Sequence, residues 1–388
     1  MATPTSYGIS GYGGMILDRS RSTGYVPALR RAIRPGCTVL DLGAGTGFFA
    51  LLACQFGAGR VYSVEPGDTI HLGRELAVAN GCADRVVFIQ DISTRVTLPE
   101  QVDIIISDLH GALPLFERHI PSIVDARQRF LAPGGVLIPQ RETVWAALAA
   151  APELYRKHYE TPWAENGYSL QMSAVKRFAT NALRGSRFNA DQLIVDPQLW
   201  ATLDYMSIED PNVAGEVAWS IQQPGTAHGL AIWFDTAFAD DIGFSNAPGQ
   251  PDTIYGQMFL PWPDPVELAA GDAVTCLLKA DLVGDDYTWT WRTRVCPKGN
   301  GAQVKADFRQ STFFGTPLSS ASLRKREAGY RPSLGEAGQI ERFMLSQMDG
   351  HATVDEIARR TLQQFPDAFA DLKSAMTRAG ELSQRFGR

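Results

Sequence analysis

The sequence lacks features that mark several classes of protein. Its five cysteines are scattered with no CxxC pair, which suits reduced thiols and argues against a structural zinc site. No apolar run is long enough for a transmembrane helix, and the stretch MATPTSYGISGYGG lacks the basic and apolar regions of a signal peptide. With 36 basic and 42 acidic residues, the net charge of −6 argues against bulk electrostatic binding of nucleic acid or membranes. We therefore expect a cytoplasmic protein without a metal, nucleic-acid or membrane partner.

The 388 residues are 45% hydrophobic and 20% charged, which is typical of a folded chain of two or three domains. Residues 1–140 alternate Val- and Ile-rich runs with segments of helical period, so they predict a parallel, doubly wound α/β sheet. Residues 141–318 carry short alternating stretches between Pro and Gly, which indicates an antiparallel sandwich or barrel. Within them, residues 162–196 look partly helical. Residues 319–388 are helical in composition.

The expected elements can be placed along the chain. The runs expected to form strands of the parallel sheet are Thr38–Leu42, Arg60–Val64, Val86–Ile89, Asp103–Ser107 and Leu131–Ile138. Helices are expected at Phe48–Phe56 and Thr69–Asn80. In residues 334–388 an apolar face precedes a Thr353–Glu356 capping box, and a third helix is expected over Asp367–Gly380.

A glycine-rich turn follows the first expected strand in TVLDLGAGTGFFA. Gly43, Gly45 and Gly47 allow the backbone to pass close to a ligand, and the N-terminus of the next helix favours a negative group. Glu65 directly follows the second expected strand. An acidic residue about 20 residues after such a loop can bind two ribose hydroxyls. The pattern G-x-G-x-G, followed by VVFIQD and VDIIISD, resembles class I S-adenosylmethionine (SAM) methyltransferases. A Rossmann-like domain that binds NAD is the alternative.

The resemblance to SAM methyltransferases implies a set of cofactor-binding residues. Asp41, Gly43 and Gly45 would line the methionine and sugar end of SAM, and Glu65 would bind the ribose. Asp91 and Ile92 would lie near the adenine, with a turn-capping role as the alternative for Asp91.

A narrower resemblance covers about residues 12–318. MILDRSR (Met15–Arg21) and DIIISDLHGALPLFE (Asp103–Glu117) are similar to two motifs of the protein arginine methyltransferases. The resemblance implies that Arg21 pairs with the SAM carboxylate, and that Asp108 and Glu117 are the two catalytic acids. It also implies a β-barrel with a dimerisation arm near residues 162–196, and hence a homodimer. Two carboxylates suit this chemistry because they can hold a planar guanidinium by charge-assisted hydrogen bonds and accept its proton.

Several positions depart from the family pattern. The first acid is Asp108 rather than Glu, and Leu109-His110 replaces Trp-Met. A barrel loop that carries Thr-His-Trp in the family reads Thr253-Ile254-Tyr255, so its histidine is absent. His110 is a candidate base or substrate contact, or else a partly exposed loop histidine. Tyr12 and Tyr255 are candidate substrate-binding residues. These changes fall in the expected substrate pocket, whereas the expected SAM pocket keeps the family pattern. The sequence therefore predicts the same methyl donor and a different acceptor.

The C-terminal residues 334–388 resemble small winged-helix modules of the PqqD type, which bind leader peptides. The residues that carry this resemblance are FMLSQMDGHATVDEIARR (Phe343–Arg360). A leader peptide is thus a candidate partner, and a helical cap or an oligomer contact is the alternative.

The sequence as a whole predicts a SAM-dependent N-methyltransferase, with S-adenosylhomocysteine as product. The acceptor would be a guanidino or related nitrogen of a small molecule, free amino acid or peptide in specialised metabolism. O- or C-methylation of another metabolite, or a non-catalytic peptide-binding scaffold, are the alternatives.

Overall fold

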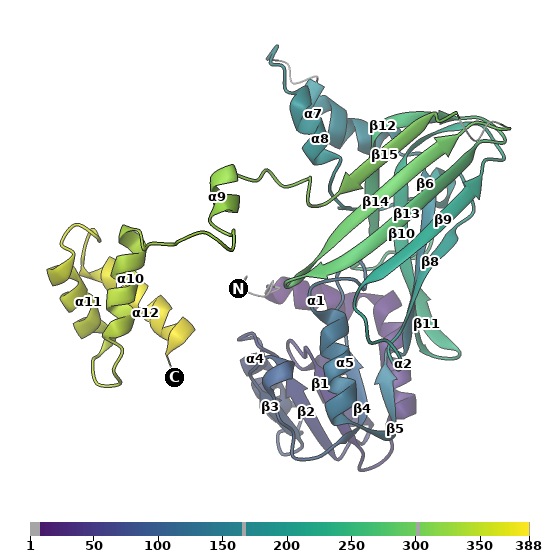
Figure 1. Ribbon diagram of the computed structural model, residues 1–388. Coiled ribbons are helices and arrows are strands. Elements are labelled where there is room, and N and C mark those ends of the chain that lie inside the picture. Colours follow the sequence, from purple (N-terminus) through teal and green to yellow (C-terminus); the bar gives the residue numbers. More distant parts are fainter. Residues whose placement is uncertain (1–7, 165–167, 300–302, 388) are drawn as a thin grey trace. The chain divides into compact units, whose positions relative to one another are not determined.

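The computed structural model describes residues 8–164, 168–299 and 303–387. The chain divides into two compact units, residues 1–317 and residues 318–388. Figure 1 shows the first unit as a parallel α/β layer followed by long antiparallel strands, and the second as a group of helices. Residues 165–167, inside the predicted arm, lie outside the described residues.

The first unit begins with the parallel sheet that the sequence predicts. Its strands run in the order β3-β2-β1-β4-β5. Their bounds are β1 (Thr38–Leu42), β2 (Arg60–Val64), β3 (Val86–Ile89), β4 (Val102–Ser107) and β5 (Leu131–Ile138). The connections are α3 (Phe48–Phe56), α4 (Ile70–Ala79), η1 (Ser93–Arg95) and α5 (His119–Phe130). The strand order reverses between β1 and β4, and open α/β sheets bind ligands at the carboxyl ends of the strands beside such a point.

Two helices precede this sheet, α1 (Ile9–Leu17) and α2 (Arg19–Ala32). Asp18 begins α2 as its N-cap, because its carboxylate accepts a hydrogen bond from the Arg21 backbone N–H at 3.0 Å. Tyr25 of α2 is fully buried, with ring contacts to Phe49 and Phe238. Phe49 belongs to α3 and Phe238 to the antiparallel region, so α2 joins the two layers of this unit.

The antiparallel region confirms the predicted β structure and divides it between two sheets. One has the order β7-β12-β10-β6-β8, with β11 paired to β10, and the other has the order β15-β14-β13-β9. Their inner faces share one hydrophobic cluster. The bounds are β6 (Arg141–Ala149), β7 (Arg184–Ser186), β8 (Gln198–Asp204), β9 (Val213–Ser220), β10 (Gly225–Ala239), β11 (Ile242–Ser245), β12 (Gln257–Leu268), β13 (Ala273–Val283), β14 (Asp286–Cys296) and β15 (Ala306–Ser311).

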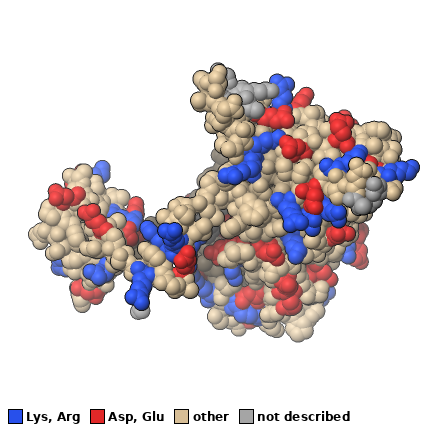
Figure 2. Space-filling view, turned by 45° about the horizontal axis from the view of Figure 1, so that its top comes forward, with Lys and Arg blue, Asp and Glu red and all other residues tan. Residues whose placement is uncertain are grey.

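Short helical turns interrupt this region, as the sequence predicts, but they begin earlier than expected. The turns are α6 (Pro152–Tyr155), η2 (Arg156–Glu160), α7 (Thr161–Ala164), η3 (Ser173–Val175), α8 (Lys176–Ala179) and η4 (Ala190–Gln192). Proline at the first position of α6 suits a helix start, because its missing N–H needs no partner there. On the face of the first unit seen in Figure 2, acidic and basic side chains are interspersed.

The second unit contains α9 (Ser320–Arg324), α10 (Glu336–Ser346), α11 (Val354–Gln364) and α12 (Leu372–Phe386). The last three helices bury a small core that includes Met344, Ile357 and Leu382. The predicted third helix over Asp367–Gly380 is wrong in its bounds. Asp371 accepts a hydrogen bond from the Ser374 backbone N–H at 2.7 Å and therefore starts α12 later. No helix in the described parts of the chain has the length and apolar character needed to cross a membrane.

The predicted capping box at the start of α11 is confirmed and can be tested. Thr353 Oγ1 accepts from the Glu356 backbone N–H at 3.2 Å, and Glu356 accepts from the Thr353 backbone N–H at 2.8 Å. Thr353→Ala removes this cap, so we expect the free energy of opening α11 to fall by about 0.5–2 kcal/mol. Amide hydrogen exchange of the full chain measures this change. Thr377→Ala, inside α12, is the control, and an equal effect of both substitutions would contradict the capping role.

Candidate functional site

The predicted site residues gather where β1 and β4 end beside α1 and α2. Three glycines in the loop after β1 adopt positive φ, namely Gly43 (71°), Gly45 (54°) and Gly47 (75°). A Cβ on Gly43 would lie 2.2 Å from Leu109, and one on Gly45 would lie 2.3 Å from the Tyr12 ring. Both the backbone conformation and the close packing therefore require glycine here. Tyr12, predicted as a substrate contact, lies against the glycine loop.

Two buried or half-buried carboxylates stabilise this loop. Glu65 accepts hydrogen bonds from the backbone N–H groups of Gly45 at 3.0 Å and Gly67 at 2.7 Å. Asp41 is buried and accepts from the Ala50 backbone N–H at 3.0 Å, near the start of α3. Burial raises the pKa of Asp41 to about 7, although the Ala50 N–H opposes the shift. The loop thus presents backbone donors and carboxylates to the same end of the sheet.

Asp91 and Ile92 follow β3 and are both partly exposed. Asp91 Oδ1 accepts a hydrogen bond from the Ile92 backbone N–H at 2.7 Å. This contact runs to the adjacent residue, whereas a capping side chain accepts from an N–H two or three residues further on. The expected contact of Asp91 and Ile92 with an adenine ring stays a prediction.

A buried ion pair forms the centre of the site. Arg21 Nε donates to Asp108 Oδ2 at 2.6 Å, and the side chains are only 6% and 10% exposed. Arg21 also donates to the Met15 carbonyl oxygen at 3.1 Å, and its guanidinium lies over the Phe49 ring. Burial alone would raise the pKa of Asp108, but the Arg21 and His110 interactions and the hydrogen bonds from Arg21 and Tyr255 together hold it below its usual range. Asp108 is therefore an ionised carboxylate in a largely dry environment.

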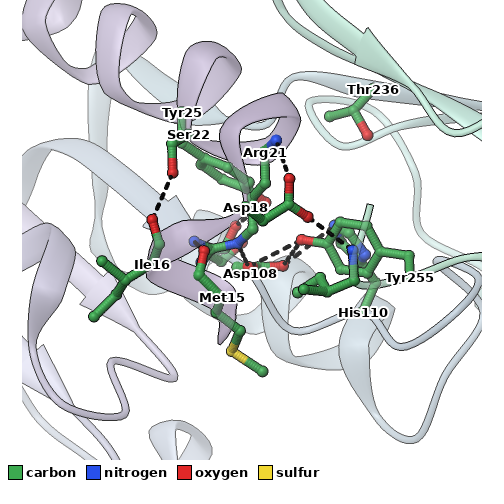
Figure 3. A network of polar contacts seen from close by, with 12 residues as sticks. Met15, Ile16, Asp18, Arg21, Ser22, Tyr25, Asp108, His110, Thr236 and Tyr255 are labelled. Carbon is green, nitrogen blue, oxygen red and sulfur yellow. Dashed lines mark hydrogen bonds and ion pairs between the residues drawn. The ribbon is translucent and has the colours of Figure 1, made fainter. Parts of the chain in front are cut away.

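A loop of the antiparallel region completes this centre from the opposite side. The Tyr255 hydroxyl donates to Asp108 Oδ1 at 2.9 Å, and the neighbouring Ile254 N–H donates to Asp18 at 2.7 Å. Tyr255 was expected to contact substrate, and the structure gives its hydroxyl to Asp108. Figure 3 shows Arg21, Tyr255 and His110 converging on Asp108.

His110 is buried, so its interpretation as a partly exposed loop histidine is wrong. Its Nε2 lies 3.4 Å from Asp108 Oδ1 and 3.2 Å from Glu142 Oε1. Glu142 is fully buried at the start of β6 and accepts from the hydroxyl groups of Tyr205 and Thr236. The sequence reasoning missed Glu142. Its position one alternation step before buried Val144 was the available signal, since it places a carboxylate on an inward face.

Glu117, the second predicted acid, is half-buried and adopts a φ of 42° just before α5. Positive φ is uncommon for a residue other than glycine and often marks a functional position. Its pairing with Asp108 stays a prediction. The structure therefore brings together Arg21, Asp108, His110 and Tyr255.

Two family models match this chain. The arginine methyltransferase oligomerization subdomain matches residues 142–292, and the ribosomal protein L11 methyltransferase (PrmA) model matches residues 23–166. The chain resembles the protein arginine methyltransferases. The arginine methyltransferase match covers most of the antiparallel region, and the PrmA match covers the parallel sheet.

Relatives and solved structures agree with this resemblance. The chain is 30% identical over 234 residues to "Probable protein arginine N-methyltransferase 6" of Arabidopsis thaliana, covering 58% of this chain and 53% of that protein. It is 28% identical over 330 residues to mouse protein arginine N-methyltransferase 2, covering 80% and 71%. The chain spans about half the length of the first curated relatives that it matches.

The solved structures define the fold that this arginine-methyltransferase-like chain adopts. Arabidopsis thaliana protein arginine methyltransferase 10 gives a TM-score of 0.70 at 23% identity, covering 79% of this chain and 97% of that one. The Trypanosoma brucei PRMT1 enzyme–prozyme complex with AdoHcy also gives 0.70 at 23% identity, covering 77% and 96%. The fold of the first unit is that of the arginine methyltransferases.

The buried ion pair predicts a large effect on stability. Arg21→Met leaves the Asp108 carboxylate buried without its cation, which we expect to lower the free energy of unfolding by about 3–5 kcal/mol. Denaturant unfolding monitored by circular dichroism measures the change. Arg31→Met is the matched control, because Arg31 pairs with Asp241 at the exposed surface. Equal stability losses in both variants would show that burial of the pair does not matter.

Asp41 predicts a dependence of stability on pH. Because its pKa is raised to about 7 in the folded protein, its contribution to stability is present at low pH and is lost as pH rises from about 4 to about 7. The loss can reach ~4 kcal/mol. Asp41→Asn keeps an acceptor for the Ala50 N–H and should remove this slope, so the variant becomes more stable than the wild type at pH 8. Unfolding curves recorded across this pH range test the prediction, and identical slopes would contradict it.

Proposed function

We propose that this protein is a SAM-dependent N-methyltransferase of the arginine-methyltransferase type. The observation that carries the proposal is the buried carboxylate of Asp108, held by Arg21 at the carboxyl end of β4. This carboxylate stands at the switch point of an open α/β sheet, beside the glycine loop. The resemblance to arginine methyltransferases supports the same conclusion from the sequence.

The residues around the glycine loop fit SAM. Its sulfonium carries the methyl group that is transferred. Gly43 and Gly45 allow close approach of a ligand, and Glu65 supplies a carboxylate suited to two ribose hydroxyls. Arg21 supplies the cation suited to the methionine carboxylate. The full proposed set is Arg21, Asp41, Gly43, Gly45, Glu65, Asp91 and Ile92.

A cationic acceptor suits the acidic lining of the site. Asp108 would hold one edge of a guanidinium, Glu117 would hold the other, and both would aim one nitrogen at the methyl group. Tyr255 keeps the Asp108 carboxylate in place through its hydroxyl. The acceptor would be a small molecule, a free amino acid or a peptide in specialised metabolism. O- or C-methylation is disfavoured, because a buried ionised carboxylate favours binding of a cation.

The acceptor assay uses the full chain with three guanidino probes: free arginine, agmatine and an arginine-containing peptide. Asp108→Asn removes the negative charge that holds the acceptor, so we expect turnover to fall about 10²–10⁴-fold. Calorimetry should show that the folded Asp108→Asn variant still binds SAM, whereas Glu65→Ala should weaken SAM binding. Asp125→Asn, in a surface pair with Arg129, is the control. Full activity of Asp108→Asn would contradict the guanidinium-binding role, and binding of NAD without SAM would contradict the cofactor.

The arm suggests how a homodimer forms. Residues 142–292 match an oligomerization subdomain, and Tyr168 and Leu170 of the arm are 81% and 60% exposed. Large exposed apolar side chains often mark an interaction surface. We expect the wild type to sediment as a dimer at micromolar concentration and the Tyr168→Asp/Leu170→Asp variant as a monomer. A wild-type monomer, or a variant that stays dimeric, would contradict this role of the arm. The role of residues 334–388 as a PqqD-like module for a leader peptide stays a prediction.

A further inference from the structure

We propose that His110 and Glu142 form a proton relay, which carries the proton released by methyl transfer from Asp108 to the buried Glu142 carboxylate. This inference rests on the proposed function and adds to it a second carboxylate and a defined path for the proton. The path is read from two short distances at one atom. His110 Nε2 lies 3.4 Å from Asp108 Oδ1 and 3.2 Å from Glu142 Oε1.

The His110 ring is held in place but its nitrogens are not committed to other groups. The side chain is fully buried, and ring contacts with Tyr255, Phe234 and His119 surround it. Within the described part of the chain, neither ring nitrogen has a hydrogen bond of good geometry. A buried polar group without such a bond is costly, and it calls for an explanation in terms of a proton or a ligand.

Glu142 has the properties of a proton acceptor. Burial raises the pKa of Glu142, while His110 and the hydroxyl groups of Tyr205 and Thr236 oppose the shift. The carboxylate therefore binds a proton more readily than an exposed glutamate does, yet the two hydroxyl groups still stabilise its ionised form. A raised pKa together with two hydroxyl donors suits a carboxylate that takes up a proton and releases it again.

The titratable groups that the described structure places against His110 are Asp108, Glu142, His119 and Tyr255. Asp108 carries the Arg21 charge on its far side, and Glu142 is the second carboxylate. His119 lies 5.7 Å away between ring centroids, and burial lowers its pKa to about 3, so it stays neutral. His119 therefore adds no positive charge beside the Asp108 and Glu142 carboxylates.

Methyl transfer releases one proton, which moves from the acceptor nitrogen to Glu142. When the nitrogen lone pair of the acceptor bonds to the methyl carbon, the carbon–sulfur bond breaks and its electron pair stays on sulfur. The alkylated nitrogen then carries one proton too many and gives it to Asp108. His110 Nε2 then gives a proton to Glu142 Oε1 and takes one from Asp108 Oδ1, so the imidazole returns to its starting form. The acceptor product keeps a single positive charge, and Glu142 holds the released proton.

This relay would compensate for a missing residue. The barrel loop Thr253-Ile254-Tyr255 has no histidine where the resembling family has one, and Ile254 offers only its backbone N–H, to Asp18. His110, in the loop after β4, instead places an imidazole against the Tyr255 ring, with 4.7 Å between the ring centroids.

The first test is the pH dependence of single-turnover methyl transfer to a guanidino probe that the wild type methylates. His110→Gln and Glu142→Gln should each lower the rate about 10²-fold near neutral pH, with a smaller deficit at alkaline pH, where hydroxide removes the proton. SAM affinity should stay unchanged in both. His351→Gln, at an exposed position of the second unit, is the control. A deficit of equal size at every pH would indicate a merely structural role and overturn the relay, as would wild-type rates.

A second readout needs no turnover and no bound ligand. Infrared spectroscopy of the ligand-free protein detects the carbonyl stretch of a protonated carboxyl group, and Glu142→Gln assigns the part that belongs to Glu142. His110→Gln removes a neighbour that lowers the pKa of Glu142, so this band should persist to higher pH than in the wild type. A Glu142 band that is absent at all pH values, or that does not respond to His110→Gln, would overturn the relay. A wild type that methylates no guanidino probe would instead overturn the proposed function, and the relay with it.

Discussion

The ion pair between Arg21 and Asp108 is the interaction on which the site depends. Neither side chain could be buried alone, because an isolated charge in a dry environment costs several kcal/mol. The pair therefore fixes α2 against the end of β4, and Tyr255 extends the same contact to the antiparallel region. The parallel sheet, the N-terminal helices and the barrel loop meet at one carboxylate. A shift of α2 from the end of β4 would leave a charge without its partner, and a shift of the barrel loop would break the Tyr255 hydrogen bond to Asp108.

Most of the parallel sheet could be predicted from the sequence because its strands are short, continuous apolar runs. β1, β2 and β3 begin and end at the predicted residues. The start of α12 was predicted wrongly. The apolar pattern begins before Asp371, but the Asp371 side chain caps the helix and so decides where it begins. The division of the antiparallel strands between two sheets depends on contacts between residues far apart in the chain, which local pattern does not contain.

Residues of the site that stand in sequence motifs were predicted, and the residue that joins the site only through packing in the folded chain was missed. Asp108 and Arg21 stand in recognisable motifs, but their direct contact joins residues 87 positions apart. Glu142 belongs to no motif and is a carboxylate in an otherwise ordinary strand. Its importance comes from the burial of His110, Tyr205 and Thr236 around it, and only the folded chain brings these groups together.

The central claim is that this site transfers a methyl group from SAM to a guanidino nitrogen. The most direct measurement incubates the protein with SAM carrying a deuterated methyl group and a guanidino acceptor, and locates the label by tandem mass spectrometry. The label should appear on a guanidino nitrogen with the wild type and be nearly absent with Asp108→Asn. A label on oxygen or carbon, or no transfer to any guanidino compound by a protein that binds SAM, would contradict it.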